Sequence, residues 1–170
     1  MRNTLTHWAR RVYRNGKLNL TGATPDAQLV AAAIERQVEI QVAGTDRNID
    51  TAFAELVQKR VDAFVVTADV VLAGRQTQIL TLAARHALSA IYFTRAWADA
   101  GGLMSYGPIA TEQGRQAGIY TGRVLKAEKP AELPVMRGTK FEFIINLATA
   151  RAIGITVPPT LLATADEVIE

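Results

Sequence analysis

Short apolar segments alternate with amphipathic segments of helical length along most of this chain, and this alternation constrains the fold more than any other feature. Val61–Thr67 ends in an almost wholly apolar run, Ala90–Phe93 is a second apolar run, and residues 73–86 between them repeat apolar side chains at helical spacing. A strand that is apolar on both faces is typical of a parallel sheet covered by helices. Strands that alternate with helices of this length favour βαβ units with right-handed crossovers. The sequence therefore predicts an α/β fold, a three-layer sandwich around a parallel sheet.

The same pattern extends in both directions along the chain. Thr24 and Pro25 have the residue types of a helix N-cap and first helical position, and Pro108 begins a helix that we expect to reach Lys126. The other predicted strands are Val38–Val42, Leu103–Tyr106, Phe141–Asn146 and Glu167–Ile169, and the other predicted helices begin at Thr45 or Asp46, at Ala96, at Ala148 and at Pro158. For 170 residues, one domain with a substantial core is the natural expectation.

The positive charge of the chain is concentrated at its start. Residues 1–24 include four arginines and Lys17 and no acidic residue, so this stretch carries a formal charge of +5. The remaining residues carry −2, and the formal net charge of the chain is +3. Such a start is compatible with a transit peptide or a nucleic-acid-binding arm, but we favour a poorly ordered basic leader over residues 1–23 and one α/β lobe over residues 24–170.

Neither a secretory signal nor a membrane anchor is predicted. Thr4–Tyr13 supplies no apolar core of a signal peptide. No apolar run approaches the roughly 20 residues of a membrane-spanning helix. As written, the chain is expected to be cytoplasmic, with no membrane insertion and no nucleic acid as partner.

The sequence offers no set of residues for catalysis. It has no cysteine, which removes thiolate nucleophiles, and its two histidines, His7 and His86, have no further ligands at metal-binding spacing. Ser89 and Ser105 lack the flanking glycines of a nucleophile elbow. We therefore predict that the protein is not an enzyme and carries neither a metal nor another cofactor.

Three predicted loops at the carboxyl ends of strands form the candidate ligand site, because open parallel sheets bind ligands at this edge. Asp69 offers a carboxylate to a ligand ammonium group, and Arg95 offers two parallel hydrogen bonds to a carboxylate. Aromatic walls and hydroxyl donors complete a site suited to a small zwitterion such as an amino acid. The full candidate set is Thr67, Asp69, Phe93, Thr94, Arg95, Ser105 and Tyr106. The alternatives are structural: Asp69 caps the following helix, and Arg95 is a surface residue.

Glycine recurs at every fourth position of the predicted helix 109–126, as Gly114, Gly118 and Gly122. Each glycine in a helix interior costs about 1 kcal/mol relative to alanine. Three glycines on one face indicate that another element approaches the helix backbone closely. Arg115 and Arg123 interrupt the segment, so the membrane interpretation of this spacing does not apply.

Gly101–Pro108, Lys140–Asn146 and Pro158–Leu162 together resemble segments of the ABC-transporter substrate-binding proteins that have the type I periplasmic-binding-protein architecture. The resemblance runs from about Asp46 to Glu170 and corresponds to the C-terminal lobe of a receptor whose two lobes close on a small solute, in some relatives an aromatic amino acid. It implies a periplasmic protein that binds an amino-acid-like small molecule in its cleft and delivers it to an ABC permease. We expect the first lobe to be missing from this chain.

In that architecture the helix 109–126 packs on the first lobe. We therefore expect it to pack either on a missing lobe or on a second copy of the chain, which would make a homodimer. The competing hypothesis is a stand-alone dimeric domain for ligand sensing or interaction without a transport role. An α/β enzyme is the least favoured interpretation.

Overall fold

The computed structural model describes residues 17–21, 37–41, 46–135, 138 and 140–170. Over these residues seven strands form one sheet in the order β2-β1-β3-β4-β5-β6-β7. The strands are β1 (Lys17–Thr21), β2 (Gln37–Gln41), β3 (Ala63–Val66), β4 (Ser89–Tyr92), β5 (Met104–Pro108), β6 (Phe141–Asn146) and β7 (Glu167–Ile169). The helices are α3 (Asp46–Gln58), α4 (Val70–Ala73), α5 (Gln76–Arg85), α6 (Arg95–Asp99), α7 (Ala110–Leu125), α8 (Leu147–Ala152) and α9 (Pro159–Leu162), with a 3-10 turn η1 (Pro130–Glu132).

The sheet is mostly parallel, which confirms the predicted α/β class. All neighbouring pairs among β1 to β5 are parallel, and β6 pairs in parallel with β7. The β5–β6 pair is antiparallel, with Tyr106 opposite Phe143 and Pro108 opposite Phe141. The chain leaves the sheet from β5 through α7 and returns into β6, so the start of β6 lies beside the carboxyl end of β5.

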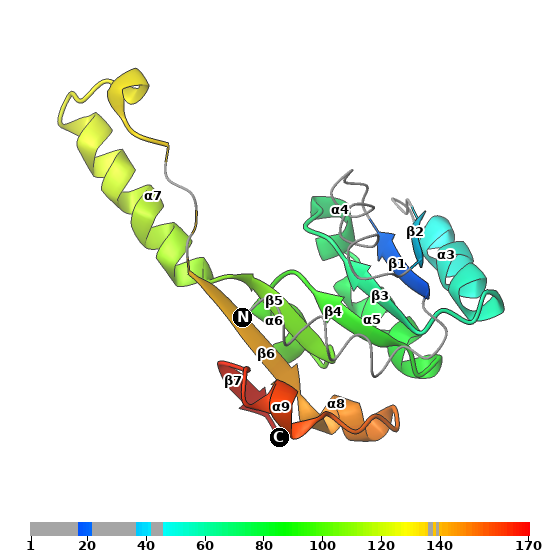
Figure 1. Cartoon of the computed structure of the whole chain (residues 1–170). Helices are drawn as coiled ribbons and strands as arrows, with labels where there is room; N and C mark the ends of the chain where they lie inside the picture. The colour runs from blue at the N-terminus through cyan, green and yellow to red at the C-terminus, as the bar shows by residue number, and fades with distance from the viewer. Residues whose placement is uncertain (1–16, 22–36, 42–45, 136–137, 139) are drawn as a thin grey trace.

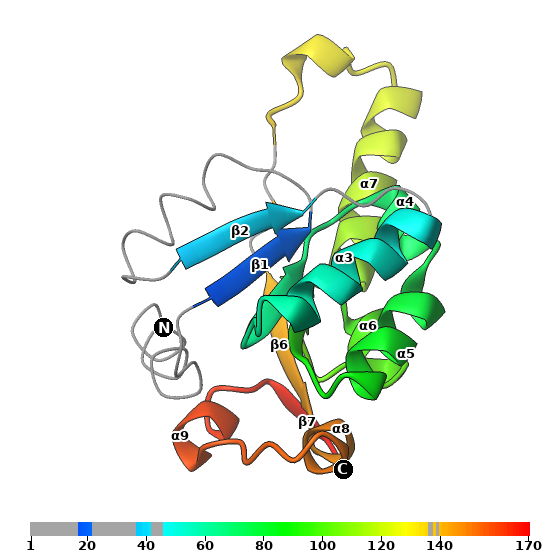
Figure 2. The same cartoon turned by 90° about the vertical axis from the view of Figure 1, so that its right-hand side faces the viewer.

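Two core clusters lie on opposite faces of the sheet. Because Met104 is opposite Ile91 and Ser105 is opposite Tyr92, and successive residues alternate faces, Met104 and Tyr92 point to different sides. Tyr92 belongs to the cluster packed under α3, α5 and α6, the helices that Figure 2 shows on one side of the sheet. Met104 belongs to the cluster under α8 and α9. The expected helical cover on both faces is therefore present.

The structure places part of the predicted leader in the sheet. Lys17–Thr21, placed in the leader, forms β1, an inner strand that pairs with both β2 and β3. Leucine alternates with polar residues in this stretch, as expected for a strand, and the basic composition of residues 1–24 obscured that pattern. The helix predicted from Thr24 lies outside the described residues, as do residues 1–16.

Two predicted helix starts also differ from the structure. The helix expected over 73–86 corresponds to α5, which begins at Gln76, and a separate short helix that Asp69 caps, α4, precedes it. Pro108 ends β5 and does not begin α7, whose N-cap residue is Ile109. Gly154, which follows α8, has a φ of +74°, a conformation that glycine adopts without strain.

Helix α7 and the turn η1 form an arm that projects away from the sheet (Figure 1). No residue of α7 is buried. A Cβ placed on Gly114, Gly118 or Gly122 would have no neighbour within 4 Å. The glycine face predicted to meet another element therefore contacts none of the described residues. Nowhere in the described part of the chain is a helix both long and apolar enough to cross a membrane.

Candidate functional site

The carboxyl ends of β3, β4 and β5 lie side by side, because the three strands are parallel neighbours in the sheet. The contact between the β4 and β5 ends is especially close. A Cβ placed on Gly107 would lie 1.9 Å from the Phe93 carbonyl oxygen. Only glycine therefore fits at residue 107, and the loop from Phe93 to Arg95 rests on the end of β5. The structure thus brings the three predicted segments to one edge, although Ser105–Gly107, predicted as a loop, lies within β5.

Asp69 acts as a helix cap in this structure. Its Oδ1 accepts hydrogen bonds from the backbone N–H groups of Val71 at 2.8 Å and Leu72 at 3.0 Å. These bonds satisfy amides that have no partner inside α4. A ligand ammonium group would have to share a carboxylate that already has this structural role.

The guanidinium group of Arg95 is held by acidic side chains of the chain itself. Two of its nitrogens donate to the carboxylate of Glu167 at 2.6 and 2.7 Å, and a third donates to Asp99 at 3.2 Å. Glu142 lies 3.8 Å away. The Arg95 hydrogen bond lowers the pKa of Glu167, and the same bond raises the pKa of Arg95. The two-pronged geometry expected for a ligand carboxylate is present, but Glu167 occupies it.

The remaining predicted residues differ in how accessible they are. Ser105 is fully buried and does not reach the surface of the edge, and its hydroxyl has no hydrogen-bond partner among the residues that the structure describes. Phe93 is half-buried and packs against Trp97 with ring centroids 5.8 Å apart. Thr94 is at the N-cap of α6 without a side-chain capping bond, and Thr67 follows β3 half-buried.

Tyr106 is the predicted residue with a large apolar surface open to solvent, and the structure gives it an aromatic neighbour. Its side chain is 48% exposed, and that of Phe141 is 46% exposed. Their ring centroids are 5.5 Å apart and their planes differ by 15°. We call Tyr106 and Phe141 the aromatic pair. Sequence reasoning missed Phe141 because it assumed parallel strands, and only an antiparallel β6 brings its first residue to this edge.

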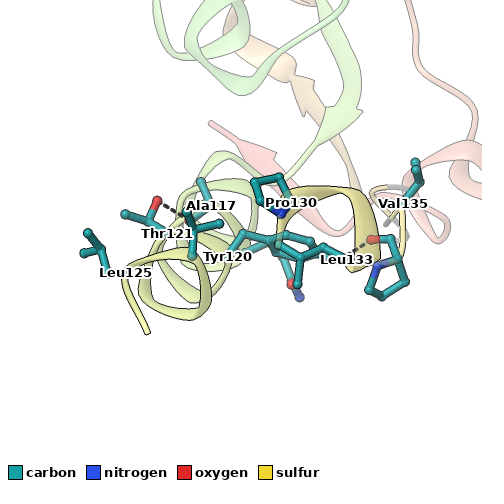
Figure 3. A pocket seen from close by; sticks show the side chains of 10 residues that line it. Ala117, Tyr120, Thr121, Leu125, Pro130, Leu133 and Val135 are labelled. Carbon is teal, nitrogen blue, oxygen red and sulfur yellow. Dashed lines mark hydrogen bonds between the residues drawn. The ribbon is translucent and has the colours of Figure 1, made fainter. Parts of the chain in front are cut away.

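A second apolar surface lies on the arm, away from the predicted site. A cleft of about 640 Å³ runs between α7 and the connector that follows it. Figure 3 shows Tyr120 between the helix and the connector, and its hydroxyl donates to the carbonyl of Pro134. The lining residues are Gln116, Ala117, Tyr120, Thr121, Val124, Leu125, Pro130, Leu133, Pro134 and Val135. The cleft and the glycine face are both open, so other described residues leave much of the arm uncovered.

Charged side chains fix the base of the arm. Glu112, in the first turn of α7, pairs with Arg115 at 2.5 Å and with Lys140 at 3.5 Å. Hydrogen bonds from Arg115 and then Gln116 are the main reason that the pKa of Glu112 falls to about 2. The backbone N–H of Ile109 also donates to the carbonyl of Lys140 at 3.2 Å. The two chain segments that enter and leave the arm are therefore joined where they meet the sheet.

Comparison with known proteins gives the family of this chain. Residues 17–169 match the model of the ABC transporter substrate binding protein family, and the chain belongs to this family. A comparison with curated proteins found no match.

Solved structures share the fold. The ABC domain from Streptococcus pneumonia in complex with L-Trp is 22% identical, with a TM-score of 0.82 over 96% of this chain and 60% of its own. A conserved domain protein from Vibrio cholerae is 18% identical, with a TM-score of 0.84 over 96% of this chain and 58% of its own. A ligand-free, open substrate binding protein with adhesive properties from Clostridium difficile is 15% identical, with a TM-score of 0.61 over 96% of this chain and 58% of its own. The chain thus spans about three fifths of the length of each of these proteins.

Proposed function

We propose that this chain forms one lobe of a two-lobed solute receptor of an ABC-type uptake system. The family supports the receptor role, and the greater length of the solved neighbours supports a second lobe outside this chain. The ligand is a small molecule such as an amino acid, held at the carboxyl edge of the sheet. L-Trp bound to one neighbour supports that class. In this role the protein works in the periplasm and has an ABC permease as partner.

The uncovered arm is the observation that carries the proposal. The match to the two neighbours with the higher TM-scores covers 96% of the chain, which leaves out about seven of 170 residues. Since α7 alone has 16 residues, most of it must lie within the matched fold. The matched region therefore includes α7, which in this chain has no buried residue and lies beside an apolar cleft. We infer that the second lobe covers this arm.

Calorimetric titration with a panel of amino acids tests the ligand-binding part of the proposal. An isolated lobe contributes half of a cleft, so we expect binding in the millimolar range, about 4 kcal/mol. Nuclear magnetic resonance titration extends the measurement to that range. If no amino acid of the panel perturbs residues at the carboxyl edge, the proposed ligand class is wrong.

Glycine substitution on the arm tests the docking part. Gly118→Leu adds a large side chain where the isolated chain has nothing within 4 Å, so the fold is retained while any close partner is blocked. The control is Gln113→Leu, which lies five residues away, or about 140° around the helix from Gly118. The partner for the experiment is the proposed second lobe, supplied as a separate chain. Association that Gly118→Leu abolishes and Gln113→Leu leaves intact supports the proposal.

The same variants distinguish the competing function, a stand-alone dimeric sensing or interaction domain built on α7. The exposed glycine face is the observation that favours it. In that case light scattering shows a dimer of the chain alone at tens of micromolar, and Gly118→Leu converts it to a monomer. A monomer with or without the substitution counts against the dimer.

A further inference from the structure

At the carboxyl edge, Val70 and Val71 of α4 are exposed aliphatic residues, and the aromatic pair is the exposed aromatic surface among the described residues. Single exposed apolar residues are ordinary, but adjacent ones at a ligand-binding edge call for an explanation. The other exposed large hydrophobics among the described residues are aliphatic and lie on helices or on the connector after α7. Tyr106 and Phe141 are both aromatic, lie on neighbouring strands, and have nearly parallel rings.

A buried aromatic ring supports the Tyr106 side of the pair. The register puts Tyr106 opposite Phe143 and Pro108 opposite Phe141, so the three aromatic side chains share one face of β5 and β6. Phe143 is buried and meets the Tyr106 ring at a steep angle, 66° between planes, with centroids 6.5 Å apart. This ring belongs to the core cluster under α8 and α9. The pair is therefore an exposed aromatic stack, and the packed core supports it through Tyr106.

We propose that the aromatic pair is the surface on which a flat, conjugated group of the ligand lies, and that Phe141 is a specificity-determining residue of the cleft. The assignment to a ligand rests on the proposed receptor function. Aromatic rings prefer offset-stacked or edge-to-face contact with another ring, and this preference adds to the gain from burying apolar area. A saturated ring of similar size gains the area alone. The site thus selects for flatness and not only for hydrophobicity.

A pair of matched ligands tests the proposal on the unmodified chain. L-phenylalanine and L-cyclohexylalanine differ in the flatness of the ring and share the zwitterionic part. We expect L-phenylalanine to bind about five-fold more tightly, the range expected for one added stacking contact. Equal affinities would overturn the proposal.

Substitution then assigns the preference to the two residues. Phe141→Leu and, separately, Tyr106→Leu keep apolar volume but remove one flat ring, and each should reduce the five-fold ratio toward one. Val57→Ala removes exposed apolar surface from α3 and should leave the ratio unchanged. Circular dichroism confirms that each variant is folded. A preference that survives in both leucine variants would refute the role of the pair.

A titration with indole tests the aromatic pair separately from the proposed receptor function. It carries the flat group without the amino-acid part, and its binding is followed by the ring resonances of Tyr106 and Phe141. If indole perturbs those rings while no amino acid of the panel binds, the surface is correctly assigned and the amino-acid ligand class is wrong. If amino acids bind but indole perturbs neither ring, the receptor function stands and the aromatic pair is not its ring site.

Discussion

Replacing Gly107 by alanine should destabilise the protein more than any other single methyl addition in β5 or α7. The new Cβ would lie 1.9 Å from the Phe93 carbonyl oxygen and 2.8 Å from its carbonyl carbon. Real Cβ atoms essentially never make contacts below 3.0 Å, so the backbone of β5 or of the β4–α6 loop must move by about 1 Å. Overpacking that forces such a shift costs about 3 kcal/mol. For a chain of this size, this loss lowers Tm by about 6–12 °C.

The matched control is Gly114→Ala on the arm. A Cβ there meets nothing within 4 Å, and alanine is favoured over glycine in a helix interior by about 1 kcal/mol. The same chemical change should therefore have opposite signs at residues 107 and 114. Urea unfolding followed by circular dichroism measures both. If Gly107→Ala unfolds at the same urea concentration as the unmodified chain, the close contact between β5 and the Phe93 loop is wrong.

Three further outcomes follow from the side-chain contacts. Asp69→Ala removes the cap of α4 and should cost about 1 kcal/mol in urea unfolding, while Asp69→Asn, which keeps an acceptor, should cost less. The pKa of Glu112 is lowered from 4.5 to about 2, so its contribution to stability is present above pH 4.5 and is lost as the pH falls toward 2. Glu112→Gln should therefore lower Tm near neutral pH and have no effect near pH 2; an equal effect at both pH values would contradict the ion pairs at the arm base. Arg95→Lys loses the two-pronged bond to Glu167 and should lower Tm, and an unchanged Tm would show that this exposed pair adds nothing to stability.

The strands were predictable from sequence where apolar runs mark them, as in β3, β4 and β6. Strand β1 was not, because its short alternating pattern is embedded in a basic stretch whose composition indicated a leader. The direction of β6 also has no local signature. It depends on the excursion through α7, which reverses the chain between two strands that become neighbours.

The candidate site was likewise predictable from sequence only in part. The position of the edge followed from the order of strands and helices, and the three segments named from sequence lie there, with Ser105–Gly107 in β5 and not in a loop. The sequence left the roles of Asp69 and Arg95 open between ligand binding and a structural role, because a carboxylate that binds an ammonium group is also a good cap, and a guanidinium group that binds a ligand also binds glutamate. Glu167, the partner of Arg95, is 72 residues away in sequence. Only the three-dimensional structure shows that it fills the position.

The inner location of β1 has a practical consequence for work with shortened chains. A chain that begins at Thr24 would lose the strand that joins β2 to β3, since β2 pairs only with β1 among the described strands. The parallel edge of β3 would then be open to other molecules, the usual origin of edge-to-edge aggregation. Insolubility of such a truncated chain would therefore report a broken sheet and would say nothing about whether the lobe is stable alone.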